Sequence, residues 1–108
     1  YIGSNGKLIE TAFFDKNLPY LFGKPKIDEF INFKMLIDDS KFSYTNIIEL
    51  YHFPSNRWDI KTKNGILIKL PKNETLNSLN LIFDFMNSQK LSKTKIIDAR
   101  IKNKLIIK

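Results

Sequence analysis

The chain contains no cysteine and only one histidine, His52. Without thiols it can form neither disulfides nor thiolate metal sites, and one histidine cannot build a two-histidine metal site. The absence of disulfides does not distinguish a cytoplasmic protein from a periplasmic one. We therefore expect no metal or other cofactor, and a fold that is stable without covalent cross-links.

Long hydrophobic runs are also missing. No stretch approaches the about 18 apolar residues that a membrane span needs, so we expect any membrane anchor to lie outside these 108 residues. The chain begins with Tyr1 rather than methionine, which we interpret as the start of an excised fragment, so the missing targeting segment carries no weight. The composition, with 43% hydrophobic residues, is that of one globular domain covering residues 1–108.

Arginine is scarce although the chain is basic. The net charge is +7, yet sixteen of the cations are lysines and only Arg57 and Arg100 are arginines. Sixteen isoleucines and eleven asparagines accompany the lysines, and A/T-rich codons encode all three residue types. The lysines are scattered without a block of like charge. A solvated lysine-rich surface is therefore favoured over a nucleic-acid-binding face, with an anionic membrane surface as a third alternative.

Local patterns predict the elements of the first half of the chain. Residues 1–14 are typical of a small hairpin around a Ser-Asn-Gly turn. Residues 16–26 contain two prolines and a glycine and are predicted to form a loop. A helix is predicted from there to about Ser40, with Pro25 at its start, where the missing N–H costs nothing. Residues 45–53 are rich in β-branched and aromatic side chains, which indicates a strand.

Residues 56–71 carry the most specific pattern. The Asn64-Gly65 dipeptide marks a hairpin turn, but a two-residue loop would mix apolar and charged side chains on both faces. A three-residue loop with Gly65 in a left-handed conformation separates them. One face then carries Trp58, Ile60, Thr62, Ile66, Ile68 and Leu70, and the other carries Asp59, Lys61, Leu67 and Lys69. Because the buried face decides the register, we predict the three-residue loop and place this hairpin in the core framework.

A second helix is predicted over residues 74–91, with Asn73 as its N-cap. Its apolar stripe consists of Leu76, Leu79, Phe83 and Met86, opposite Asn77, Asn80, Asp84 and Asn87. Two strand-like runs, residues 93–100 and 104–108, close the chain. The predicted order is strand, helix, three-strand meander, helix and strand pair. The fold class is therefore α+β: a largely antiparallel sheet with two helices packed on one face and a C-terminal edge strand.

No group of side chains indicates catalysis. His52 lies in a strand pattern and is more typical of a structural or solvent-facing residue, and the carboxylate pairs are adjacent helical residues that do not face each other. The serines lack a nucleophile-elbow setting, and the glycines form no phosphate-binding loop. Trp58 could be a stacking platform for a nucleic-acid base, but the predicted register places it in the core. We expect a protein that is not an enzyme.

Three segments carry a resemblance to a known family. "KNLPYLFGK" (16–24) is similar to a Leu-Pro and Gly segment before the first helix, and "NRWDIKTKNGILIKLP" (56–71) is similar to an Arg-Trp-Asp hairpin that runs through an Asn-Gly turn. "IIDAR" (96–100) is similar to a closing Asp-Leu-Arg. Taken in this order, they resemble the extracytoplasmic β domain of the FtsQ/DivIB bacterial cell-division family over the whole chain, and most closely its alphaproteobacterial branch.

The resemblance implies a longer protein and a scaffold role. It implies a short cytoplasmic tail, one transmembrane helix and a POTRA domain upstream of Tyr1, which would place this domain on the periplasmic side of the bacterial inner membrane at the division septum. It also implies a divisome scaffold that recruits the FtsB–FtsL pair and, through it, the septal peptidoglycan synthase. The partner would add as a strand beside the last strand of this domain.

The resemblance also assigns roles to residues of this sequence. Arg100 would pair with an acidic residue of FtsB, and Arg57 would lie beside a second charged contact. The docking edge would contain Ile101, Asn103, Leu105 and Ile107. Two positions depart from the family pattern, because Ala99 replaces the usual leucine and Ile101 stands where relatives can carry tyrosine.

Two alternatives remain open at this point. The closing strand could be paired internally, with its lysines acting only as protection of the sheet edge. The alternative function is a small basic nucleic-acid-binding module, which would bind phosphates with a strong dependence on salt.

Overall fold

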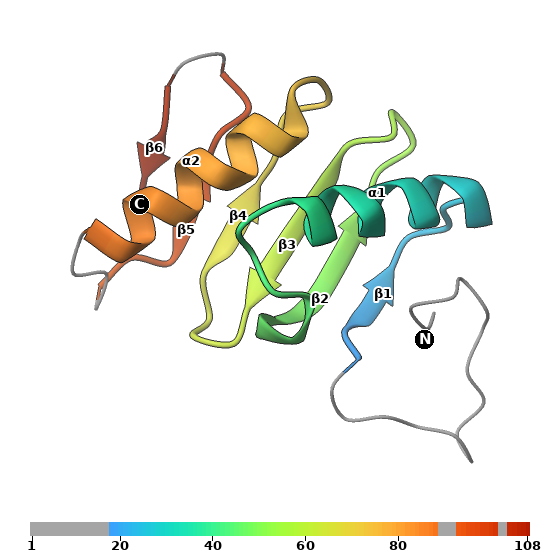
Figure 1. Ribbon diagram of the computed structural model, residues 1–108, viewed down its shortest axis with the longest axis horizontal. Coiled ribbons are helices and arrows are strands. Elements are labelled where there is room, and N and C mark those ends of the chain that lie inside the picture. Colours follow the sequence, from blue (N-terminus) through green and yellow to red (C-terminus); the bar gives the residue numbers. More distant parts are fainter. Residues whose placement is uncertain (1–17, 89–92, 102–103) are drawn as a thin grey trace.

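The computed structural model describes residues 18–88, 93–101 and 104–108 (Figure 1). The strands are β1 (Tyr20–Phe22), β2 (Ile47–His52), β3 (Trp58–Thr62), β4 (Leu67–Lys69), β5 (Ile96–Asp98) and β6 (Ile106–Ile107). The helices are α1 (Ile27–Asp39) and α2 (Thr75–Ser88), and a short 3-10 helix, η2 (Tyr44–Asn46), precedes β2. The strands form one sheet in the order β1-β2-β3-β4-β5-β6, so β1 and β6 are its edges.

The predicted fold class is confirmed. The pairs β2–β3, β3–β4 and β5–β6 are antiparallel, and both helices lie on the same side of the sheet (Figure 1). The pairs β1–β2 and β4–β5 are parallel, and in each of them a helix connects the two strands. These are two β-α-β units that run in the same direction along the sheet. Because such crossovers have one preferred hand, both helices are placed on the same face.

The β3–β4 hairpin has the predicted register. Ile60 lies opposite Ile68, and the amide of Gly65 donates a hydrogen bond of 3.0 Å to the carbonyl of Thr62. Gly65 has a φ of 84°, as a left-handed loop position requires. The six side chains of the predicted core face are all 5% exposed or less. The three-residue loop is therefore confirmed, and this hairpin lies at the centre of the core.

Residues 20–22 form a strand where the sequence predicted a loop, so that prediction was wrong. β1 pairs in parallel with β2, and Leu21 lies opposite Leu50. Three residues are too few for the alternation of a strand to show in a sequence. The pairing with a segment about thirty residues away, rather than any local pattern, makes this stretch a strand.

Helix α1 begins close to its predicted limit. Its N-cap residue is Lys26, whose backbone amide donates a hydrogen bond of 2.8 Å to Oε1 of Glu29. Pro25 therefore lies one residue before the cap rather than inside the first turn. The buried side chains of the helix are Phe30, Phe33 and Ile37. The ring of Phe33 stacks on Trp58 with centroids 4.3 Å apart, which fixes α1 on β3.

Helix α2 differs from its prediction at two points. An N-cap at Asn73 would make Glu74 the first helical residue, but the helix begins one residue later, at Thr75. Glu74 has a φ of 57°, which is not a helical conformation, so it cannot belong to the helix. Its fully buried residues are Leu79 and Ile82, and the predicted stripe omitted Ile82. The other stripe positions, Leu76, Phe83 and Met86, are half-buried. The side of α2 that faces the sheet is therefore rotated slightly, toward Ile82, from the side that the spacing of apolar residues predicted.

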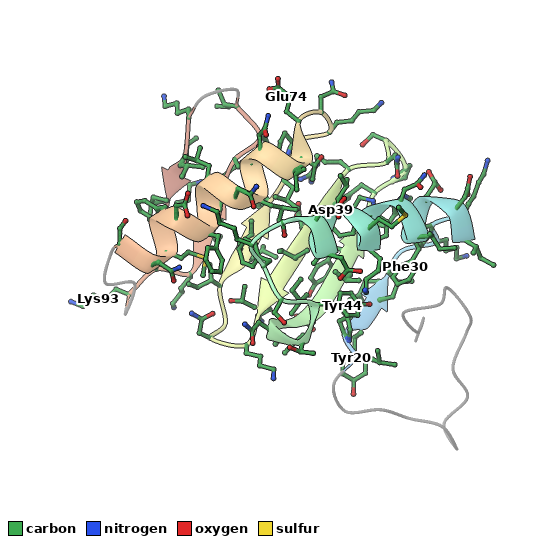
Figure 2. All side chains as sticks on the ribbon, in the orientation of Figure 1. Tyr20, Phe30, Asp39, Tyr44, Glu74 and Lys93 are labelled. Atoms are coloured by element: carbon green, nitrogen blue, oxygen red, sulfur yellow. The ribbon has the colours of Figure 1, made fainter. Side chains whose placement is uncertain are left out.

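Side chains from the sheet and from both helices form one hydrophobic core (Figure 2). Lys41, which follows α1, joins the helices at the surface, since its amide donates to Oδ1 of Asn80 at 2.8 Å and its ammonium lies 2.7 Å from Oδ1 of Asp84. Among the described residues, no helix is long and apolar enough to cross a membrane. The predicted hairpin of residues 1–14 lies outside the described residues.

The two glycines with positive φ give a test of the fold. A Cβ on Gly23, at φ 101°, would lie 2.4 Å from the carbonyl oxygen of His52, whereas a Cβ on Gly65 would meet no atom within 4 Å. We expect Gly65→Ala to lower the free energy of unfolding by about 1 kcal/mol through backbone strain alone. Gly23→Ala adds a clash that separates β1 from β2 and should cost at least about 2 kcal/mol. Urea denaturation measures both, and equal losses would contradict the packing of β1 on β2.

Candidate functional site

The free edge of β6 is the first part of the candidate site. β6 pairs with β5 so that Ile107 lies opposite Ile97, and Lys108 exchanges backbone hydrogen bonds of 2.9 and 3.1 Å with Ile96. Hydrogen-bonded and non-hydrogen-bonded residue pairs alternate along an antiparallel ladder. Because Lys108 and Ile96 form a hydrogen-bonded pair, the neighbouring pair of Ile107 and Ile97 is not hydrogen-bonded. Its N–H and C=O therefore point away from β5. Within the described sheet, no strand lies on that side of β6.

The side chains of the predicted docking edge differ in exposure. Ile101 is 53% exposed and Ile107 is 39% exposed, whereas Leu105 is half-buried against the core. Ile101 lies in the bend after β5 and not in a strand. Asn103, the remaining predicted edge residue, lies outside the described residues. The described side chains of the predicted edge are therefore apolar, and Lys104 and Lys108 lie exposed beside them.

Arg100 is held by Asp98. Its Nε donates to Oδ1 at 2.9 Å, its Nη2 donates to Oδ2 at 2.7 Å, and its backbone amide donates to Oδ1 at 3.0 Å. The side-chain hydrogen bonds from Arg100 are the main reason that the pKa of Asp98 falls to about 2, although burial acts in the opposite direction. The Arg100 side chain is 46% exposed, and its Nη1 forms no hydrogen bond within the described residues. It can therefore accept a second carboxylate.

Arg57 is held in a similar way but is more enclosed. Its Nη1 donates to Oδ1 of Asp59 at 2.5 Å and to the carbonyl of Leu70 at 3.3 Å, and its guanidinium lies 4.4 Å from the centre of the Phe53 ring. Burial raises the pKa of Asp59, and the charge of Arg57 counteracts this rise. The Arg57 side chain is 19% exposed, so it offers a partner less surface than Arg100 does.

The two arginines end a row of alternating charges that crosses the sheet. Asp59 lies opposite Lys69, and Lys69 lies opposite Asp98, on the face that the helices leave uncovered. The row therefore runs Arg57, Asp59, Lys69, Asp98, Arg100. The sequence singled out only its two ends. The hairpin register predicted from the sequence already placed Asp59 opposite Lys69. Asp98 joins the row through the parallel pairing of β4 with β5, and no local sequence pattern indicates that pairing.

The remaining residues that the sequence singled out have structural surroundings. Trp58 is 5% exposed and stacks on Phe33, so it offers no free ring face to a base. Asn64 accepts a hydrogen bond from the hydroxyl of Thr62 in the hairpin loop. The side chain of His52 is 7% exposed and its ring packs edge-on against Trp58, with centroids 4.7 Å apart. In the described part of the chain, no group of three His, Cys, Asp or Glu side chains could hold a metal ion.

The lowered pKa of Asp98 predicts how stability depends on pH. Because the pKa is about 2 in the folded protein and 3.8 without the fold, the carboxylate stabilises the fold above about pH 4 and this contribution is lost as the pH falls toward 2. Asp98→Asn should lower the unfolding free energy at pH 7 by about 1 to 2 kcal/mol and should flatten the acid limb below pH 4. Asp39→Asn, at an exposed helix end, is the control and should keep the wild-type acid limb. Urea denaturation between pH 2 and 7 measures both, and an unchanged limb in Asp98→Asn would contradict the Arg100 pairing.

Comparison with protein families connects this geometry to a function. The model of the family described as "Cell division protein FtsQ/DivIB, C-terminal" matches residues 1–100, and no curated protein matches the chain. The matched range contains the Arg57 hairpin and ends at Arg100, just before the bend that leads to β6. The match covers most of the chain and confirms the resemblance that the sequence motifs carry. The chain therefore belongs to the FtsQ/DivIB family of cell-division proteins, which act as scaffolds.

Proposed function

We propose that this domain is a non-enzymatic divisome scaffold that recruits the FtsB–FtsL pair by strand addition at β6. The observation that carries the proposal is the backbone of Ile107, whose N–H and C=O point outward from the last strand of the sheet. An added strand would satisfy these groups with main-chain hydrogen bonds. The exposed side chain of Ile107 would be covered at the same time.

Charge favours an acidic partner segment at this edge. Arg100 lies at the start of the bend that leads to β6, and Lys104 and Lys108 lie near and at the end of the chain. The basic edge would speed the encounter with an acidic segment, and a carboxylate of FtsB would bind the exposed side of Arg100. Arg57 lies on the same uncovered face at the other end of the charge row, where it would make a second, smaller contact.

The proposal includes a location. Family membership supports a membrane-associated cell-division protein. We place the domain on the periplasmic side of the inner membrane at the division septum, attached through a transmembrane helix upstream of Tyr1. In that position it would meet the periplasmic parts of FtsB and FtsL and would hold them beside the septal peptidoglycan synthase.

An NMR titration tests strand addition. The isotope-labelled domain is titrated with the C-terminal segment of FtsB from the same genome, and we expect shifts concentrated at Ile106, Ile107 and Lys108. Ile107→Pro removes the outward N–H and no hydrogen bond of the β5–β6 ladder, so it should weaken binding about tenfold or more while the β5–β6 pairing remains. Ile107→Val keeps the N–H and is the matched control. It should bind within about twofold of the wild type.

Two outcomes would count against the proposal. If the wild type shows no shifts at millimolar peptide, the edge does not recruit this partner. If Ile107→Pro binds as well as Ile107→Val, binding does not use the outward backbone groups of β6 and strand addition is wrong.

A further inference from the structure

Lys69 lies at the centre of the charge row, on the face of the sheet that the helices leave uncovered (Figure 1). It lies opposite Asp59 of β3 on one side and opposite Asp98 of β5 on the other. Neighbouring strands are about 4.8 Å apart, so one ammonium group lies near two carboxylates. Each carboxylate already has an arginine as its ion-pair partner, so Lys69 is an additional cation.

The two carboxylates of the row are buried, which makes their charges costly. Asp59 is 4% exposed and Asp98 is 6% exposed. Burial raises the pKa of Asp59, and the charges of Arg57 and Lys69 counteract this rise. Hydrogen bonds from Arg100 are the main cause that lowers the pKa of Asp98 to about 2, and the charge of Lys69 lowers it further. Lys69 therefore stabilises the charged form of both carboxylates.

The charges of the row do not balance. Three cations, Arg57, Lys69 and Arg100, face two carboxylates, so the row carries one positive charge in excess. The neighbouring pair of Lys61 and Glu49, 3.8 Å apart, adds no net charge to this face. One bound carboxylate would make the row neutral. Without Lys69, the same carboxylate would leave a net negative charge beside two buried anions, which is unfavourable.

The excess charge is needed because Arg100 would serve two carboxylates at once. Its Nε and Nη2 already donate to Asp98, and a carboxylate of the partner would bind its exposed side. A guanidinium between two anions compensates each of them less than it compensates one. Lys69 forms no direct ion pair within the described residues, so its charge remains to compensate Asp98 when Arg100 is shared.

We propose that Lys69 is a positioning residue for partner recognition, which keeps Asp59 and Asp98 compensated while Arg100 binds an acidic side chain of the partner. The proposal rests on the proposed function, because it takes the contact of Arg100 with the partner as its starting point. It adds that the row accepts one carboxylate. It also makes the affinity depend on a lysine of β4, which is two strands away from β6 in the sheet.

Four forms of the domain test the proposal in titrations with the same FtsB segment. At pH 7, Lys69→Met should weaken binding about threefold to fivefold, whereas Lys69→Arg keeps the charge and should bind within about twofold of the wild type. Lys61→Met removes the same charge from the same face, beside Glu49 and outside the row, and is the matched control. It should also bind within about twofold of the wild type.

The dependence on pH separates this role from a merely structural one. Without the charge of Lys69, the pKa of Asp59 and that of Asp98 both rise, so these carboxylates are protonated and release their arginines at a higher pH. On acidification from pH 7 to about pH 4, Lys69→Met should therefore lose binding at a higher pH than Lys61→Met. The acidic groups of the FtsB segment titrate in the same way with every variant, so the difference reports the row alone. In the free domain, the carboxyl carbon NMR shifts of Asp59 and Asp98 should titrate at a higher pH in Lys69→Met.

The outcomes separate this proposal from the proposed function. If the wild type binds but Lys69→Met behaves as Lys61→Met does at every pH, the role of Lys69 is overturned and strand addition stands. If Lys69→Arg binds as weakly as Lys69→Met, the charge is not responsible, and the role is overturned as well. Unchanged carboxyl titrations in free Lys69→Met would overturn it without any partner. If the wild type does not bind the segment at all, both proposals are overturned. Lys69→Gln repeats each comparison with a polar side chain if Lys69→Met alters the fold.

Discussion

The register between β3 and β4 is the constraint on which the rest of the structure depends. With Ile60 opposite Ile68, both isoleucines face the helices, and Trp58 lies under Phe33. A slip by one residue would turn over the side chains of the strand that slips and would bring either Asp59 or Lys69 under the helices. Burying either charge there without a partner would cost several kcal/mol. The same register that builds the core therefore also builds the charge row on the opposite face.

Much of this framework could be predicted from the sequence because its signals are local. The hairpin is specified by Asn64, Gly65 and the alternation on either side, and the two helices are specified by the spacing of their apolar residues. The position of the candidate site at the last strand followed from chain order together with the family motifs. Its backbone geometry did not, since which amides of β6 point outward depends on its pairing with β5.

The parts that the sequence did not reveal depend on pairing between distant segments. β1 is a strand only because β2 accepts it, and Asp98 joins Asp59 and Lys69 only because α2 returns the chain in parallel beside β4. The order strand, helix, strand was nevertheless visible, and a single connecting helix between neighbouring strands is how parallel pairs are made. The signal that was missed lies in the order of the elements. Each helix that connects two neighbouring strands indicates that this pair is parallel, within a sheet that is otherwise antiparallel.

The proposed interface divides affinity, geometry and attraction among different groups. Asp98 holds the guanidinium of Arg100 in place, which lowers the entropy that binding a carboxylate would cost. The same ion pair cancels the charge of Arg100, so it contributes geometry rather than long-range attraction. The attraction of an acidic segment must then come from lysines that form no ion pair within the described residues, such as Lys104 and Lys108. Because these two lysines lie on either side of β6 along the chain, the attraction acts at the same edge as the outward backbone groups of Ile107.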